Sequence, residues 1–215
     1  MSNMVKRYSM FFLSLFIMGL GIGLVTSSNL GTSSISSIPY VLSMIYPLSF
    51  GMFTFITNIL FVISQKVILK EKFPKRQYMQ LVVGPFFGLF IDLGMFLFVS
   101  IHPTTYLEQL SILLLGCTIL AFGIFVQLAA NVITNPGEGF VNAISIKWNK
   151  EFSNVKVISD LVLVLIAVLF SFIAFGTIRG IREGTILSVI VVGPMIKLFK
   201  RIFSYPKFQN LKSEK

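Results

Sequence analysis

Two short polar segments interrupt an otherwise apolar chain, and their residue types suit the binding of a small ligand. Both contain the pattern Asn-x-x-Thr, at residues 29–32 and 131–134, and both are rich in Gly, Ser, Thr and Asn. These residues favour helix caps and turns, and the free N–H groups of a capped helix N-terminus bind anions or polar groups. We therefore expect the following residues to contact a substrate: Asn29, Gly31, Thr32, Asn131, Thr134, Asn135 and Glu138. An ordinary loop at the membrane surface is the alternative for each segment.

Ionisable and amide side chains within apolar stretches form a second group of candidates. A carboxylate in a bilayer costs about 2.5–3.5 kcal/mol on insertion scales, so it must be paired, protonated or in contact with water. Asp92 and Asp160 are candidates for a proton or cation coupling site, with a helix cap at the membrane interface as the alternative for Asp160. Asn58 and Gln127 are either further coupling residues or partners in hydrogen bonds between helices.

The sequence provides no set of residues for catalysis or for a metal. It contains one His and one Cys, and it has neither a phosphate-binding loop nor an HExxH motif. With a single His available we recognise no Ser-His-Asp set, and one Cys with one His cannot supply a metal cluster. We expect no enzymatic activity, no cofactor and no metal.

Composition identifies the chain as an integral membrane protein. Hydrophobic residues make up 55% of the chain and charged residues 12%, which is about half the charge of a soluble domain. No charged residue occurs from Tyr8 to Gln65, although one crossing needs only about 20 apolar residues. The lipid bilayer is therefore the first expected partner. The net charge of +10 comes from cations in loops and at the chain ends, as membrane orientation requires, so we expect no nucleic-acid partner.

Six stretches have the length and hydropathy of membrane-spanning helices. They cover about residues 8–28, 47–66, 78–101, 109–130, 155–176 and 184–201. With six crossings, the most basic connections fall on one side together with both chain ends, including the basic tail 204–215. That side is cytoplasmic by the positive-inside rule. Arg179 and Arg182 are the exception, because they fall on the opposite side.

The tetrapeptide Val-Val-Gly-Pro occurs twice, each time within a predicted helix. The second copy follows the first by 109 residues. Proline within a helix removes a backbone donor and bends the chain, so Gly84-Pro85 and Gly193-Pro194 predict matched bends.

A shift of 102 residues aligns the rest of the first half with the second. It superimposes the two Asn-x-x-Thr patterns and places Asn58 opposite Asp160. Each half then has three crossings, over about residues 8–101 and 109–203, and because three is odd the halves run through the membrane in opposite directions. The predicted fold is an all-α membrane protein, a single domain over residues 1–215. It has six transmembrane helices as two inverted three-helix repeats, with short re-entrant or interfacial segments after helices 1 and 4. Inverted repeats are typical of secondary transporters, which bind substrate near the midplane.

Two short motifs resemble those of the YczE/YyaS/YitT family of bacterial integral membrane proteins. They are Ser-Asn-Leu-Gly-Thr-Ser at residues 28–33 and Asn-Pro-Gly-Glu-Gly at residues 135–139. Members of that family typically carry Pro and then an acidic residue after the first Gly-Thr-Ser. Here those places hold Ser34 and Ser36, whereas the second copy has Pro136 and Glu138. The resemblance implies a protein of the bacterial plasma membrane and implies no substrate.

These patterns lead us to expect a permease-like transporter of a small molecule or ion in the bacterial plasma membrane. Two alternatives stay open. One is a non-transporting accessory or regulatory protein that binds a partner through its cytoplasmic loops. The other is a substrate-capturing subunit of a larger transporter. A homo-oligomer or a complex with a membrane partner is compatible with each of these functions.

Overall fold

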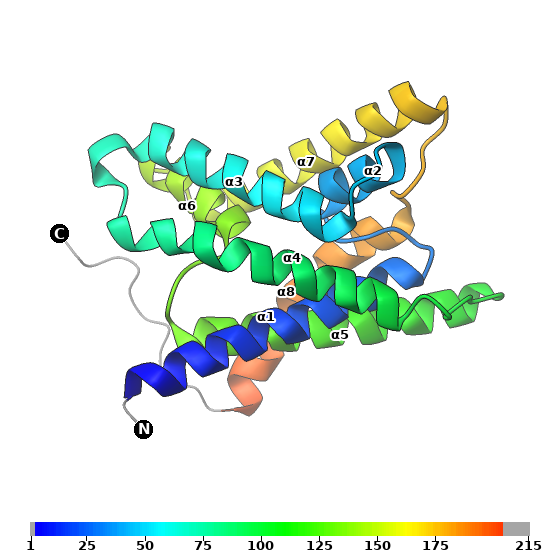
Figure 1. Ribbon diagram of the computed structural model, residues 1–215, viewed down its shortest axis with the longest axis horizontal. Coiled ribbons are helices and arrows are strands. Elements are labelled where there is room, and N and C mark those ends of the chain that lie inside the picture. The colour runs from blue at the N-terminus through cyan, green and yellow to red at the C-terminus, as the bar shows by residue number, and fades with distance from the viewer. Residues whose placement is uncertain (1–2, 204–215) are drawn as a thin grey trace.

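The computed structural model describes residues 3–203, and all the regular secondary structure in this range is helical (Figure 1). Its eight α-helices are α1 (Asn3–Ser27), α2 (Ser37–Ile45), α3 (Phe50–Leu69), α4 (Met79–Leu97), α5 (Tyr106–Ala130), α6 (Pro136–Trp148), α7 (Phe152–Phe175) and α8 (Glu183–Ile202). Two short 3-10 helices, Lys70–Lys72 and Lys75–Tyr78, connect α3 to α4. The six predicted crossings correspond to α1, α3, α4, α5, α7 and α8. The short helices α2 and α6 follow the first and fourth of these, and the basic tail 204–215 lies outside the described residues.

Five segments of the described chain are long and apolar enough to cross a membrane. They are Met4–Ser27, Phe50–Lys72, Lys75–Leu97, Tyr106–Ala130 and Asn154–Phe175. The chain is therefore a multi-pass membrane protein. Helix α8 forms where a sixth crossing is predicted, but it is not among the five. Glu183 begins this helix, and Lys197, Lys200 and Arg201 place three cations in its last two turns.

Helices α1 and α5 cross in antiparallel orientation, and small residues permit their contact (Figure 1). A Cβ atom added to Gly21 of α1 would lie 2.6 Å from the backbone nitrogen of Leu120. One added to Gly123 of α5 would lie 2.9 Å from the backbone nitrogen of Met18. Both positions therefore require glycine, and close backbone contact at small residues is a usual mode of helix association in lipid. Because the two helices are antiparallel, their C-termini lie at opposite ends of the pair.

Helix α4 packs against α1, and α8 packs against α5. The contact between α1 and α4 is again a backbone contact, since a Cβ atom on Gly23 would lie 2.5 Å from the carbonyl carbon of Gly94. The contact between α5 and α8 is aromatic. The ring of Phe125 lies 6.3 Å from that of Phe199 and 5.5 Å from that of Phe203.

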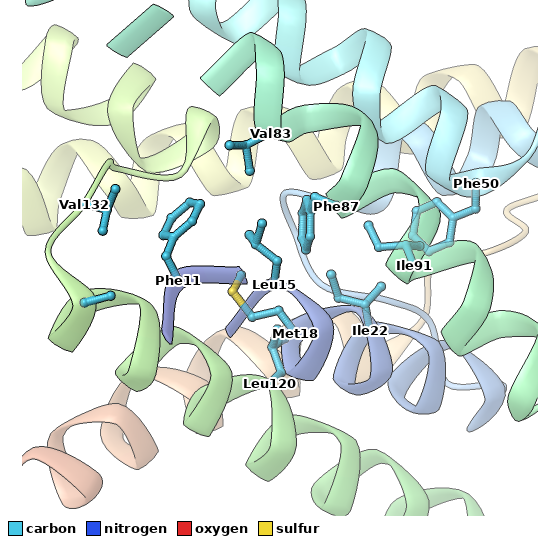
Figure 2. Packing of buried hydrophobic residues seen from close by; sticks show 11 residues of the cluster. Phe11, Leu15, Met18, Ile22, Phe50, Val83, Phe87, Ile91, Leu120 and Val132 are labelled. Carbon is cyan, nitrogen blue, oxygen red and sulfur yellow. The ribbon is translucent and has the colours of Figure 1, made fainter. Parts of the chain in front are cut away.

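The main apolar core lies between α1 and α4, as Figure 2 shows. Its labelled side chains include Phe11, Leu15, Met18 and Ile22 of α1, Val83, Phe87 and Ile91 of α4, and Leu120 of α5.

Helices α3 and α7 are placed differently. Helix α3 packs against α2, α4 and α6, and at its first turn a Cβ atom on Gly51 would meet the backbone of Gly88 in α4. Helix α7 packs against α2 and α6 but makes no comparable contact with α8 within the described residues. Many of its apolar side chains are exposed, among them Leu161, Leu165 and Leu169, and such a surface suits lipid.

We predict that Gly21→Val and Gly123→Val each destabilise the protein, because the added side chain has to displace the backbone of the partner helix. Overpacking costs about 1–3 kcal/mol when neighbours can adjust, and a backbone neighbour puts both variants at or above the upper end of that range. The measurement is the Tm of the detergent-solubilised protein. Gly193→Val is the matched control, because no atom lies within 4 Å of a Cβ at that position. Equal losses of Tm for all three variants would contradict this account of the crossing.

Candidate functional site

The polar segment between α5 and α6 turns into the interior, and its residues have local reasons for their conformation. Helix α5 ends at Asn131, which has a φ of 47° in the left-handed region that asparagine tolerates better than most residues. Asn135 caps α6, because its Oδ1 accepts a hydrogen bond of 3.3 Å from the backbone N–H of Gly137. Pro136 takes the first helical position, where no N–H is needed.

Three glutamines of the first half hold this segment in place. Gln65 of α3 donates from Nε2 to the carbonyl of Pro136 at 3.0 Å and to Oε1 of Gln80 at 3.2 Å. Gln80 of α4 donates to the carbonyl of Thr134 at 2.9 Å and to Oε1 of Gln77. Gln77 donates to the hydroxyl of Thr134 at 3.5 Å. Gln65 and Gln80 are each only 2% exposed, so this network replaces water for the backbone carbonyls of the segment.

A small cavity adjoins the network. Its volume is about 20 Å³, which is room for about one water-sized group. Its polar wall consists of Asn58, Gln80, Gln127, Thr134 and Asn135, and its other lining residues are apolar or glycine. No residue of the lining is ionisable. Four of the apolar residues, Phe11, Leu15, Val83 and Phe87, are drawn in Figure 2.

Asn58 is the exceptional member of this wall. It is 5% exposed, and its Nδ2 atom is buried without a hydrogen-bond partner in the described part of the chain. A buried donor without an acceptor costs about 1–3 kcal/mol, so a group of this kind calls for an explanation.

Charged side chains gather on the other side of α6, next to α7. Lys156 and Asp160 form an ion pair of 2.6 Å within α7, and Asp160 is 6% exposed. Burial raises the pKa of Glu138, and the charge of Asp160 acts in the same direction. The nearby charges of Lys156 and Lys200 lower this pKa, but burial has the larger effect.

The first polar segment, residues 29–32, forms hydrogen bonds with α1 and with residues at the start of α8. Asn29 has a φ of 59°, and its carbonyl accepts a hydrogen bond of 3.1 Å from Arg182. The backbone N–H of Thr32 donates to the hydroxyl of Thr185 at 3.2 Å, and the Thr32 side chain accepts from Thr26 at 3.2 Å. A hollow of about 290 Å³ adjoins Leu30 of this segment, and residues of α8, including Glu183, form most of its lining.

The two polar segments do not meet as a whole. Asn29 and Asn131 follow the C-termini of antiparallel helices, so they lie at opposite ends of the α1–α5 pair. Close to these segments, a Cβ on Gly137 would lie 3.1 Å from the side chain of Ile35. Of the predicted site residues, the cavity therefore brings together Asn58, Gln127, Thr134 and Asn135, and it leaves out Asn29, Gly31, Thr32, Asn131 and Glu138.

Asp92 and Asp160 have structural partners. Asp92 accepts hydrogen bonds from the hydroxyl of Ser49 at 2.5 Å and from the backbone N–H of Gly51 at 2.7 Å. It therefore caps the N-terminus of α3, where a negative charge is favourable. Asp160 is neutralised by Lys156, one helical turn away.

The two Gly-Pro pairs lie within α4 and α8, as predicted. Gly84 lines the cavity, and a Cβ there would lie 2.8 Å from the ring of Phe55 in α3. Gly193 has open space around it. The matched glycines thus lie in different packing environments.

Gln65, Gln77 and Gln80 were not among the predicted site residues. The available signal was their position, since Gln65 and Gln80 are uncharged polar residues inside predicted crossings and Gln77 directly precedes one.

Comparison with known proteins gives a family but no characterised relative. No curated protein and no solved structure matches the chain. The resemblance to the YczE/YyaS/YitT family therefore stays a prediction. The family DUF6198, described as a family of unknown function, matches residues 5–201. The chain is thus a multi-pass membrane protein that belongs to the DUF6198 family.

Proposed function

We propose that this protein is a small permease-like transporter in which two inverted three-helix repeats enclose a substrate site at the start of α6. The observation that carries this proposal is the position of the amide-lined cavity. Its walls come from α1, α3 and α4 of the first half and from α5 and residues 133–136 of the second. In transporters built from inverted repeats, substrate binds between the halves and next to broken helices.

Pairs of contacts support the repeat. Gly21 meets Leu120, and Gly123 meets Met18. Both pairs are the same contact under the shift of 102 residues, because 123 is 21 plus 102 and 120 is 18 plus 102. A two-fold relation between the halves produces such reciprocal pairs.

The helix packing supports the same relation. If α1, α2, α3 and α4 are equivalent to α5, α6, α7 and α8, the contact of α1 with α4 corresponds to that of α5 with α8. Likewise, the contact of α3 with α6 corresponds to that of α7 with α2, and α2 with α3 to α6 with α7. The contact between α3 and α4 is the exception, since α7 and α8 lack its counterpart within the described chain.

Two arginines are suited to close the proposed transport path at its opposite ends. Arg7 at the start of α1 donates to the carbonyl of Ala130 at 2.9 Å and to that of Asn131. Arg182, directly before α8, donates to the carbonyl of Asn29 at 3.1 Å. Each arginine thus holds the C-terminal end of a helix in the other half, where a cation is favourable. In the proposal, these two contacts break alternately as the site opens to either side.

We predict six crossings, with both termini in the cytoplasm. Green fluorescent protein fused after Lys215 is then fluorescent, and alkaline phosphatase fused at the same place is inactive, because it folds only outside the cytoplasm. Phosphatase inserted after Gly176, between α7 and α8, is the positive control and is active. Active phosphatase at the C-terminus would mean five crossings and would contradict the inverted repeat.

We predict that the purified protein is stabilised by at least one pool of small metabolites. A ligand at 100 times its Kd adds about 2.7 kcal/mol of stability, which raises the Tm by several degrees for a chain of this size. The Asn58→Leu variant should lose this shift, whereas Asn142→Leu, the same change at an amide of α6 outside the cavity lining, should retain it. Absence of stabilisation by every pool would argue against transport and for an accessory role.

We predict that Arg7→Gln and Arg182→Gln open opposite ends of the molecule. The assay places a single cysteine at the cavity, in a Cys117→Ala, Asn58→Cys background, and measures its labelling by a membrane-impermeant thiol reagent from each side of oriented vesicles. Arg7→Gln should raise labelling several-fold from the side of the N-terminus, and Arg182→Gln from the other side. Lys6→Gln removes a neighbouring charge and should leave labelling unchanged. Equal labelling from both sides in both arginine variants would rule out separate gates.

A further inference from the structure

Gln65, Gln80 and Gln127 place side-chain amides at or next to the cavity. At the equivalent positions, the other half of the proposed repeat has apolar residues. The shift of 102 residues pairs Gln65 with Ala167 and Gln127 with Val25, and the shift of 109 residues that relates the Val-Val-Gly-Pro copies pairs Gln80 with Val189. Ala167 and Val25 are fully buried, so these two equivalent places pack without an amide, whereas Val189 is 39% exposed. Helix packing alone therefore does not explain the amides at this one site.

The lining also restricts the charge of a ligand. None of its residues is ionisable. Glu138 and the Lys156–Asp160 pair are not part of the wall. A charged ligand in this cavity would lose its hydration without gaining a counter-charge, and that is far less favourable than the burial of an uncharged polar group. The occupant is therefore uncharged.

A buried donor without a partner indicates which group the ligand carries. Nδ2 of Asn58 is buried and lacks an acceptor in the described chain, whereas the amides of Gln65 and Gln80 already donate to backbone carbonyls. The missing group is a hydrogen-bond acceptor. A carbonyl or hydroxyl oxygen supplies one without a net charge.

The size and shape of the cavity limit the ligand further. A volume of about 20 Å³ accepts one water-sized group without movement of the walls. Phe11 and Phe87 contribute flat apolar surfaces to the lining. A compact solute, or the polar end of one, matches these dimensions.

We propose that the cavity selects small uncharged solutes that carry a carbonyl or hydroxyl oxygen, and that Nδ2 of Asn58 donates the hydrogen bond that recognises this oxygen. This inference rests on the transport function proposed above and names the substrate class for the same site.

Urea and guanidinium provide a matched pair of probes, because they have nearly the same shape. Urea is neutral and offers a carbonyl acceptor, whereas guanidinium is a cation with donors only. Glycerol tests a hydroxyl acceptor. Proteoliposomes are mixed with each solute in a stopped-flow instrument, and the solute flux is followed by light scattering, with empty liposomes as the baseline.

The wild-type protein should raise urea and glycerol flux above the baseline and leave guanidinium flux unchanged. Asn58→Leu, which keeps the size of the side chain and removes the donor, should lower the protein-dependent flux about tenfold. Asn142→Leu should retain it. If the Asn58 variant does not fold, the ratio of urea to guanidinium flux in the wild-type protein still tests the proposal.

Several outcomes would overturn the substrate class. Guanidinium flux equal to urea flux would do so, and so would protein-dependent water flux without solute flux. Stabilisation or transport of charged solutes alone would overturn it while leaving the transport function intact. Absence of both flux and stabilisation for every solute would overturn the two proposals together.

Discussion

A helix that ends within a membrane protein leaves backbone donors and acceptors that only the protein can satisfy, and several long-range polar contacts of the described chain serve that need. The carbonyls at the end of α5 accept hydrogen bonds from Arg7, and the carbonyl of Asn29 after α1 accepts one from Arg182. Glutamines of α3 and α4 do the same for the segment that leads into α6. This requirement fixes where α4, α6 and α8 meet the ends of the central pair.

The free-energy cost of burying a polar group helps to distinguish residues with a structural role from residues that contact a ligand. Asp92 has an ionisable side chain and is by cost of burial the strongest candidate in the sequence, but two hydrogen bonds at the first turn of α3 account for it. Asn58 carries no charge, yet its buried N–H has no acceptor in the described residues. An apolar side chain of similar size would avoid that penalty. The unpartnered amide of Asn58 is therefore better evidence for a ligand than the carboxylate of Asp92.

The sequence predicts the helices well because hydropathy and proline or glycine breaks are local signals. The six long helices and the two short ones after the first and fourth lie within a few residues of their predicted places. The site was harder to predict, because it depends on which helix faces which. Asn-x-x-Thr marks both breaks, but antiparallel packing of α1 and α5 separates Asn29 from Asn131. Gln65 and Gln80 are single amides in apolar helices, and no local pattern distinguishes a buried amide from one that faces lipid headgroups.

The halves of the proposed repeat differ in rigidity, and this difference bears on how the site would open. In the first half, α3 and α4 touch through the backbones of Gly51 and Gly88, so they would move together. In the second half, α7 lacks a comparable contact with α8 within the described residues and packs mainly against the two short helices, α2 and α6. A shift of α7 would break few contacts with the central pair. Because α6 begins at Pro136, which lines the cavity, such a shift would be transmitted directly to the site. Helix α7 is thus coupled through α6 to the amide-lined cavity.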